Sequence, residues 1–216
     1  MMMITKMIKF AAFLLLFGIA SVQAESKSFE FNFDDWPEGQ PKEEAFVVDG
    51  KFSITAKDGN KALVAEVGEL VEACVLLGDS ARGSASIQAK VFSSRKGRSL
   101  PRYSIGVHGQ SGYRLVVAPA QKQLQLTKSD EVVKSVPLEW PNEAWFHVKL
   151  EVKQLGEKQW TITAKAWADG VEEPTEGQMV HEDATLRGQG KCSLWATPYS
   201  GTPIYFDDVK IAISLE

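Results

Sequence analysis

Residues 146–153 read FHVKLEVK and residues 160–167 read WTITAKAW, with the turn-forming residues QLGEKQ between them. In both segments the even positions are apolar, and the odd positions are polar up to Trp167, the final residue. Successive side chains of a strand point to opposite faces of its sheet, so each segment buries one face and exposes the other. Because a hairpin of this length is not stable alone, the sequence predicts a larger sheet around residues 144–167.

The rest of the chain repeats this pattern in short segments. Residues 29–33 and 84–92 alternate in the same way, and residues 204–213 are expected to form the last strand. Residues 62–77 fit a helical stripe as well as strands, and the strands on both sides favour two short strands. Roughly a dozen short strands at this spacing predict an all-β fold, a two-sheet antiparallel β-sandwich or jelly roll. We expect it to be a single domain of residues 25–216.

The first 24 residues have the composition of a signal peptide. Lys6 and Lys9 precede an apolar run at residues 10–20, and Ala24 ends the small-residue pattern of a cleavage site. The run is too short to remain as a transmembrane helix. We therefore expect cleavage after Ala24, a secreted or periplasmic mature chain, and no membrane span after cleavage.

The composition indicates a globular, mildly acidic domain. The 216 residues are 44% hydrophobic and carry a net charge of -4, and removal of the signal peptide deletes lysines but no acid. Nucleic-acid binding needs clustered Lys or Arg. The densest basic stretch, residues 95–98, lies in a Ser- and Gly-rich loop. We expect no nucleic-acid partner.

Two cysteines, Cys74 and Cys192, lie in apolar, strand-like segments. Export permits a disulfide, and if the two strands are neighbours the bridge would close a long loop and stabilise the fold by about 3–5 kcal/mol. Cysteine also behaves as a small buried hydrophobe. The sequence leaves a disulfide and two separate buried thiols as equal alternatives.

Three phrases carry a family resemblance. They are FVVDGKF at residues 46–52, AWADG with a Glu-Pro pair at residues 166–174, and IYFDDVKI at residues 204–211. Their order and spacing resemble secreted bacterial concanavalin A-like jelly-roll domains, most closely the subgroup of laminin-G-like modules and 3-keto-disaccharide hydrolase-like domains. The resemblance implies that the last strand lies beside the first and that the function concerns carbohydrate.

The sequence offers no catalytic motif, so we predict no catalytic residues. It lacks the Glu-x-Asp-x-x-Glu run of the family 16 glycoside hydrolases in the same superfamily, a nucleophile elbow, and metal-ligand spacing among its histidines. The acidic residues of the irregular segment after Trp167 lack strand periodicity, so we expect them to be solvated side chains of a loop. If the chain is nevertheless a hydrolase, its candidate groups are Asp169, Glu172, Glu173 and, as a base, His181.

Four aspartates lie where the first and last strands are expected to meet. Their carboxylates could hold a Ca²⁺ ion, which takes several oxygen ligands. The sequence favours the alternative of turn chemistry, with a bulge that lets both Phe206 and Val209 face the interior. Apart from this ion we expect no cofactor. The candidate ligands are Asp34, Asp35, Asp207 and Asp208.

The aromatic residues give the strongest functional signal. Trp167 and Trp195 share the parity of the polar side chains on their strands. An exposed Trp provides a flat apolar surface with an N–H donor, which suits stacking on sugar rings. The alternative is that a loop or a second sheet covers these faces. The predicted ligand-binding residues are Trp167, Trp195, Trp140 and Tyr199.

These observations favour a secreted, non-catalytic carbohydrate-binding or cell-envelope module with a polysaccharide or glycan as its partner. One alternative is a secreted carbohydrate-active hydrolase that resembles the 3-keto-disaccharide hydrolases. The other is a structural interaction domain. The functional hypothesis rests on fold analogy and on the tryptophans.

Overall fold

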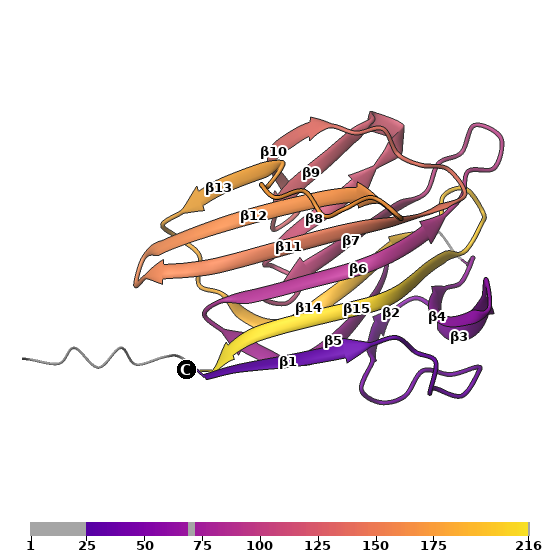
Figure 1. The fold of residues 1–216 in the computed structure, drawn as a ribbon, viewed down its shortest axis with the longest axis horizontal. Helices are drawn as coiled ribbons and strands as arrows, with labels where there is room; N and C mark the ends of the chain where they lie inside the picture. The colour runs from indigo at the N-terminus through magenta and orange to yellow at the C-terminus, as the bar shows by residue number, and fades with distance from the viewer. Residues whose placement is uncertain (1–24, 69–71, 216) are drawn as a thin grey trace, which may run out of the picture.

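The computed structural model describes residues 25–68 and 72–215, which form two packed antiparallel sheets (Figure 1). Sheet A has eight strands, with β1 beside β15 at one side of the path β13-β12-β11-β6-β15-β4-β3. Their bounds are β1 (Glu25–Phe31), β3 (Phe52–Lys57), β4 (Asn60–Ala65), β6 (Ala85–Ser93), β11 (Ala144–Gly156), β12 (Gln159–Ala168), β13 (Met179–Asp183) and β15 (Ile204–Leu215).

Sheet B has seven strands in the order β10-β9-β8-β7-β14-β5-β2. A 3-10 turn, η1 (Pro119–Gln121), joins β8 to β9. The strands of sheet B are β2 (Phe46–Asp49), β5 (Ala73–Arg82), β7 (Arg102–Val107), β8 (Tyr113–Ala118), β9 (Gln123–Lys128), β10 (Glu131–Pro137) and β14 (Gln189–Thr197). The predicted all-β sandwich is confirmed.

The hairpin predicted at residues 144–167 is β11 and β12, between the edge strand β13 and β6 in sheet A. Leu150 pairs with Ala164, Val152 pairs with Ile162, and all four side chains are fully buried. The core lies between the two sheets and is built from the alternate, inward-facing residues of both. Burial of one side-chain parity therefore fixes the register of the strands.

The ambiguous segment 62–77 contains strands and no helix among its described residues. Leu63 on β4 and Leu77 on β5 are both fully buried in the shared core. The two strands belong to different sheets, so the chain crosses from sheet A to sheet B between them. The two-strand expectation is confirmed.

The last strand carries the predicted bulge. β1 pairs along β15, and the register of β15 against β6 shifts between Asp207 and Lys210. Asp208 occupies the left-handed region with φ 47°. Phe206 and Val209 both face the core at 0% exposure. The extra residue lets both face inward, as expected for a bulge.

Of the two alternatives for the cysteines, the structure has two separate buried thiols, because both cysteines are free. Their strands are neighbours, but Cys74 lies opposite Trp195 and Cys192 lies opposite Leu77. Cys192 belongs to the core between the sheets, whereas Cys74 shares the parity of Trp195 on the outer face of sheet B. Side chains on opposite faces and three positions apart cannot be bridged.

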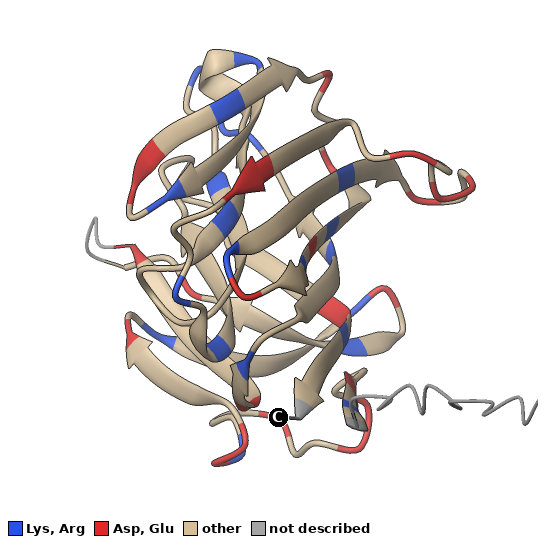
Figure 2. Ribbon diagram, turned by 90° about the vertical axis from the view of Figure 1, so that its left-hand side faces the viewer, with Lys and Arg blue, Asp and Glu red and all other residues tan. Residues whose placement is uncertain are grey.

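The signal peptide expectation falls on residues 1–24, which lie outside the described residues. In the described ranges no helix is both long enough and apolar enough to cross a bilayer. Acidic and basic positions are interspersed along the strands, without a basic cluster on the side of the molecule drawn in Figure 2.

Candidate functional site

The two tryptophans of the predicted site lie on the outer faces of different sheets. Trp167 is on β12 in sheet A, and Trp195 is on β14 in sheet B. Their side chains therefore point away from each other on opposite sides of the sandwich. Both are also buried, at 8% and 7% exposure. The expectation of exposed tryptophans is wrong, and on each face a specific neighbour covers the indole.

On sheet A the indole of Trp167 is covered by a histidine. The imidazole of His147 stacks on it with ring centroids 5.1 Å apart and an interplanar angle of 6°. Nε2 of His147 lies 2.8 Å from a carboxylate oxygen of Asp169, and Nζ of Lys90 lies 3.4 Å from the same oxygen. On this part of sheet A the indole of Trp167 is therefore covered by His147, which is itself held by Asp169.

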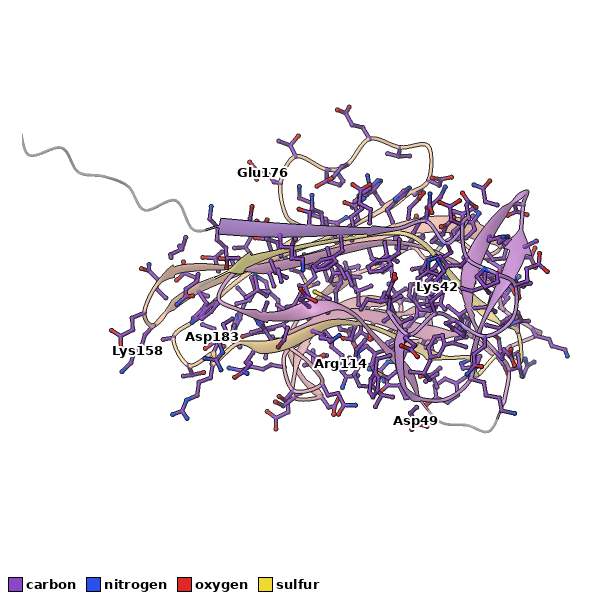
Figure 3. The ribbon with its side chains drawn as sticks, turned by 90° about the horizontal axis from the view of Figure 1, so that it is seen from below. Lys42, Asp49, Arg114, Lys158, Glu176 and Asp183 are labelled. Atoms are coloured by element: carbon purple, nitrogen blue, oxygen red, sulfur yellow. The ribbon has the colours of Figure 1, made fainter. Side chains whose placement is uncertain are left out.

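A loop of residues 169–178 covers the neighbouring part of the same face. Glu173 accepts hydrogen bonds from Nζ of Lys149 and Nζ of Lys165, at 2.9 and 2.8 Å. The side-chain amide of Gln178 pairs with the backbone N–H and C=O of Ala166. Figure 3 shows this loop, with Glu176 labelled, on the outer side of one layer.

The groups named for the alternative hydrolase are not gathered into one site. Glu173 lies over the outer face of sheet A, while His181 pairs with the inward-facing Ile162 and contacts the ring of Tyr113 at the edge of the sandwich. A carboxylate and a base on different sides of a sheet cannot act on one bond. Glu173 is ion-paired rather than solvated, which the sequence did not indicate.

Two adjacent rows of side chains cross the outer face of sheet B, and we call this surface the Arg114 face. Figure 3 shows Arg114 on the layer opposite the loop that carries Glu176. The first row is Thr127, Arg114, Gly106, Ser193 and Leu76. The second row is Gln125, Val116, Ser104, Trp195 and Cys74.

Arg114 lies at the centre of this face with its side chain 6% exposed. Its guanidinium stacks over the indole of Trp195, with the guanidinium carbon 4.0 Å from the ring centroid. Nη1 donates to Glu72 at 3.1 Å, and Nη2 donates to Asp130. The indole N–H of Trp195 donates to Oγ of Ser193 at 2.8 Å. These contacts fix the plane of the indole and of the guanidinium relative to the sheet.

Gly106 makes this packing possible. A Cβ on Gly106 would lie 2.5 Å from Oγ of Ser193 and 3.1 Å from Cγ of Arg114. Both distances are shorter than van der Waals contact, so a larger residue would push the arginine away from the sheet. The absence of a side chain at Gly106 therefore allows Arg114 and Ser193 to pack closely against the backbone of β7.

The Arg114 face carries polar side chains that are shielded from solvent. Ser104, Gln125 and Thr127 point away from the core, yet they are only 2%, 9% and 3% exposed. Because these polar side chains lie on the solvent side of the sheet, their low exposure means that neighbouring side chains pack closely around them. A hollow of about 510 Å³ adjoins it at Leu76, and its other lining residues include Phe46, Gln110 and Ser111.

Cys74 lies in the second row and is fully buried. Burial raises the pKa of its thiol to about 12, against a smaller opposing effect of the Arg114 charge. The thiol is therefore protonated at neutral pH and is not a nucleophile.

The two other predicted ligand-binding residues lie outside both rows. Trp140 packs against the core, and its indole N–H is buried without a hydrogen-bond partner in the described part of the chain. Tyr199 is 53% exposed on the turn between β14 and β15. Sequence reasoning missed Arg114, although its position gave a signal, because it interrupts the apolar strand YRLVVA at a single position.

The four aspartates do not form the calcium site that the sequence raised. Among the described residues no group of three or more His, Cys, Asp or Glu side chains is placed to hold a metal ion. Asp34 instead accepts a hydrogen bond from the backbone N–H of Lys61 at 2.9 Å. Asp207 accepts one from the backbone N–H of Asp208 at 2.7 Å. The carboxylates serve the local backbone, as turn chemistry predicts.

No family model matches the sequence, and no curated protein matches it. Among solved structures, the carbohydrate-binding module CBM66 from Bacillus subtilis is similar, with a TM-score of 0.52, 12% identity, and coverage of 77% of this chain and 94% of that one. Lectin II from Ulex europaeus gives a TM-score of 0.53 at 10% identity over 88% of this chain and 99% of the lectin.

The alginate lyase Aly36B is similar too, with a TM-score of 0.51 and 14% identity over 88% of this chain and 98% of the lyase. These structures share the two-sheet jelly roll described above. The fold is the concanavalin A-like jelly roll. In this concanavalin A-like sandwich the Arg114 face is the outer face of the seven-stranded sheet. The nearer subgroup named from the sequence stays a prediction.

Proposed function

We propose that this concanavalin A-like domain is an exported, non-catalytic glycan-binding protein and that the glycan binds on the Arg114 face. The observation that carries the proposal is the group of shielded hydroxyl and amide side chains around Trp195 on the outer face of sheet B. Such groups hydrogen-bond sugar hydroxyls, and the indole of Trp195, covered by Arg114, holds the side chains around it in place.

The fold supports the same proposal by analogy. CBM66 is named as a carbohydrate-binding module, and the similar structure of lectin UEA-II is described as complexed with galactose. Analogy of fold does not assign a site. The assignment to sheet B depends on the contacts of Arg114 and Trp195, while the loop with Glu173 covers part of the outer face of sheet A.

We expect replacement of Trp195 by Ala to weaken retention on a bound polysaccharide by about tenfold, which corresponds to about 1.4 kcal/mol. The measurement is affinity electrophoresis of the mature chain in gels that contain β-1,3-glucan, galactan, mannan or fructan. The matched control is Trp167→Ala, which removes an equally buried indole from the opposite face. Retention that depends on Trp167 and not on Trp195 would place the site on sheet A.

The exported state is part of the proposal and rests on the residue pattern before Glu25. We expect the periplasmic or secreted product to begin at Glu25, because Ala24 ends the cleavage pattern. N-terminal sequencing of the mature protein purified from the cells that export it tests this. A product that retains residues 1–24 in the membrane fraction contradicts it.

A further inference from the structure

We infer that the glycan bound on the Arg114 face is uncharged, and that the face excludes glycans rich in carboxylates. The inference rests on the proposed function, because it names the chemical class of the ligand at the same site. The inference follows from the contacts of Arg114. Its two terminal nitrogens donate to carboxylates of this chain, and one face of its guanidinium lies on the indole of Trp195.

An arginine recognises a carboxylate by presenting two N–H groups to it. On Arg114 the terminal nitrogens donate instead to Glu72 and Asp130, one on each. One flat face of the guanidinium lies on the indole of Trp195. A ligand carboxylate could pair with Arg114 only by displacing one of these carboxylates, so the buried cation does not attract an acidic glycan.

The charge around Arg114 is negative rather than positive. Besides Glu72 and Asp130, Asp49 lies on β2 opposite Cys74, which in turn lies opposite Trp195. Two carboxylates therefore contact the guanidinium, and a third, that of Asp49, lies one strand beyond Cys74. A second arginine, Arg102, begins β7 and pairs with Thr197 at the end of β14. It therefore lies beyond the two rows of the Arg114 face. Within a Debye length of about 8 Å at physiological salt, a uronate in this region would be repelled.

The remaining side chains of the face are neutral hydrogen-bonding groups. The amide of Gln125 donates to the amide oxygen of Gln123 at 2.9 Å, which leaves its own oxygen as an acceptor. Ser104, Thr127 and Thr197 add hydroxyls. Such groups match the alternating donors and acceptors of sugar hydroxyls without favouring charge.

The outer face of sheet A shows the opposite arrangement and strengthens the contrast. There Lys149 and Lys165 lie side by side, but both hold the carboxylate of Glu173. The chain thus supplies its own carboxylate to the lysine pair. A polyuronate would have to displace Glu173 before it could use these lysines.

The test uses the full mature chain in affinity electrophoresis at about 150 mM NaCl, where weak surface attraction is screened. The probes are the four neutral polysaccharides, polygalacturonate, and the C6-oxidised form of whichever neutral polymer retains the protein. We expect retention on a neutral polymer, none on polygalacturonate, and loss of most retention when the retained polymer is oxidised to uronates.

The second arm removes the negative charges that repel the uronates. We expect the double variant Glu72→Gln, Asp130→Asn to be retained on the oxidised polymer about fivefold more strongly than the wild type. The matched control is Glu157→Gln, Glu182→Gln, which neutralises two exposed acids away from this face.

The outcomes separate the inference from the proposed function. Retention of the wild type on polygalacturonate or on the oxidised polymer, weakened by salt, overturns the inference and leaves glycan binding in place. Equal gains in both double variants also overturn it, because the effect would then come from net charge alone. The absence of retention on every polymer overturns glycan binding itself.

Discussion

Replacement of Asp183 by Asn is expected to lower the free energy of unfolding by about 3 kcal/mol at pH 7. The side chain of Asp183 is 6% exposed and receives hydrogen bonds from Oη of Tyr113 at 2.8 Å and Nζ of Lys128 at 2.5 Å. The backbone N–H and hydroxyl of Thr185 donate to its other oxygen at 2.6 and 2.7 Å. An amide cannot accept all of these bonds.

Asp183 matters because it joins the two sheets. It ends β13 at the edge of sheet A, while Tyr113 and Lys128 belong to β8 and β9 of sheet B. Figure 3 shows Asp183 at one end of the sandwich, between the two layers. With an amide in its place, the hydroxyl of Tyr113 and the partly buried ammonium of Lys128 would compete for fewer acceptors, and Lys128 would keep the hydroxyl of Thr185.

The contribution of Asp183 depends on pH in a defined direction. Burial raises the pKa of this carboxyl, but hydrogen bonds from Lys128, Thr185 and Tyr113 outweigh that effect and hold the pKa well below 3.8. The folded state therefore binds fewer protons than the unfolded state. The stabilisation is present above about pH 4 and is lost as the pH falls toward the folded pKa.

Urea unfolding followed by tryptophan fluorescence, at pH 7 and at pH 3, measures this effect. The wild type and Asp183→Asn should differ most at pH 7 and less at pH 3. Glu182→Gln is the control, because Glu182 is exposed on the same strand. If Asp183→Asn unfolds within about 0.5 kcal/mol of the wild type at pH 7, then this cluster does not hold the sheets together.

Alternation was enough to predict the fold from the sequence. Across residues 146–153 and 160–166 every second side chain is polar, so a one-residue slip would turn the apolar side chains to the solvent, and the structure has a register that buries them. The bulge at Asp207 and Asp208 was predictable for the same reason, because Phe206 and Val209 have opposite parity and both are apolar.

The burial of the tryptophans was not predictable from the same pattern. Parity assigns Trp195 to the outer face of its sheet, but the residue that covers it comes from β8, and the pairing of β7 with both β8 and β14 brings the two together. Parity also does not tell whether two outer-facing residues are on the same sheet. Trp167 and Trp195 are therefore separated by the thickness of the sandwich.

The disulfide could not be decided from the sequence because β5 is apolar at both parities. Residues 73–77 read ACVLL, so no alternation marks which side chains face the core. Cys74 faces outward and Cys192 faces inward, although their strands pair as neighbours. Where both faces of a strand are shielded, hydrophobicity alone does not orient the side chains.

Replacement of Asp207 by Asn is expected to raise the free energy of unfolding by about 2 kcal/mol at pH 8. Asp207 is 6% exposed on the outer side of the bulge in β15. Burial raises the pKa of its carboxyl to about 6; the hydrogen bond from the backbone N–H of Asp208 lowers it, and the charges of Asp208 and Asp34 raise it further. Asparagine removes the charge and keeps the oxygen that accepts the bond from Asp208.

The sign of the pH dependence is opposite to that of Asp183. Because the folded pKa of Asp207 is raised, the folded state binds the proton more tightly than the unfolded state. Stability therefore falls as the pH rises from about 4 to about 6, and the full cost of the buried carboxylate is present above that window. The gain from Asp207→Asn should be largest at pH 8 and absent near pH 4.

Thermal unfolding at pH 4, 6 and 8 tests this prediction, with Asp35→Asn as the control because Asp35 is exposed in the turn after β1. The control should change the stability little at each pH, since an exposed carboxylate is solvated in both states. A gain of the same size at pH 4 and pH 8 would mean that asparagine stabilises the bulge by packing or backbone preference. The buried charge would then not be the cause.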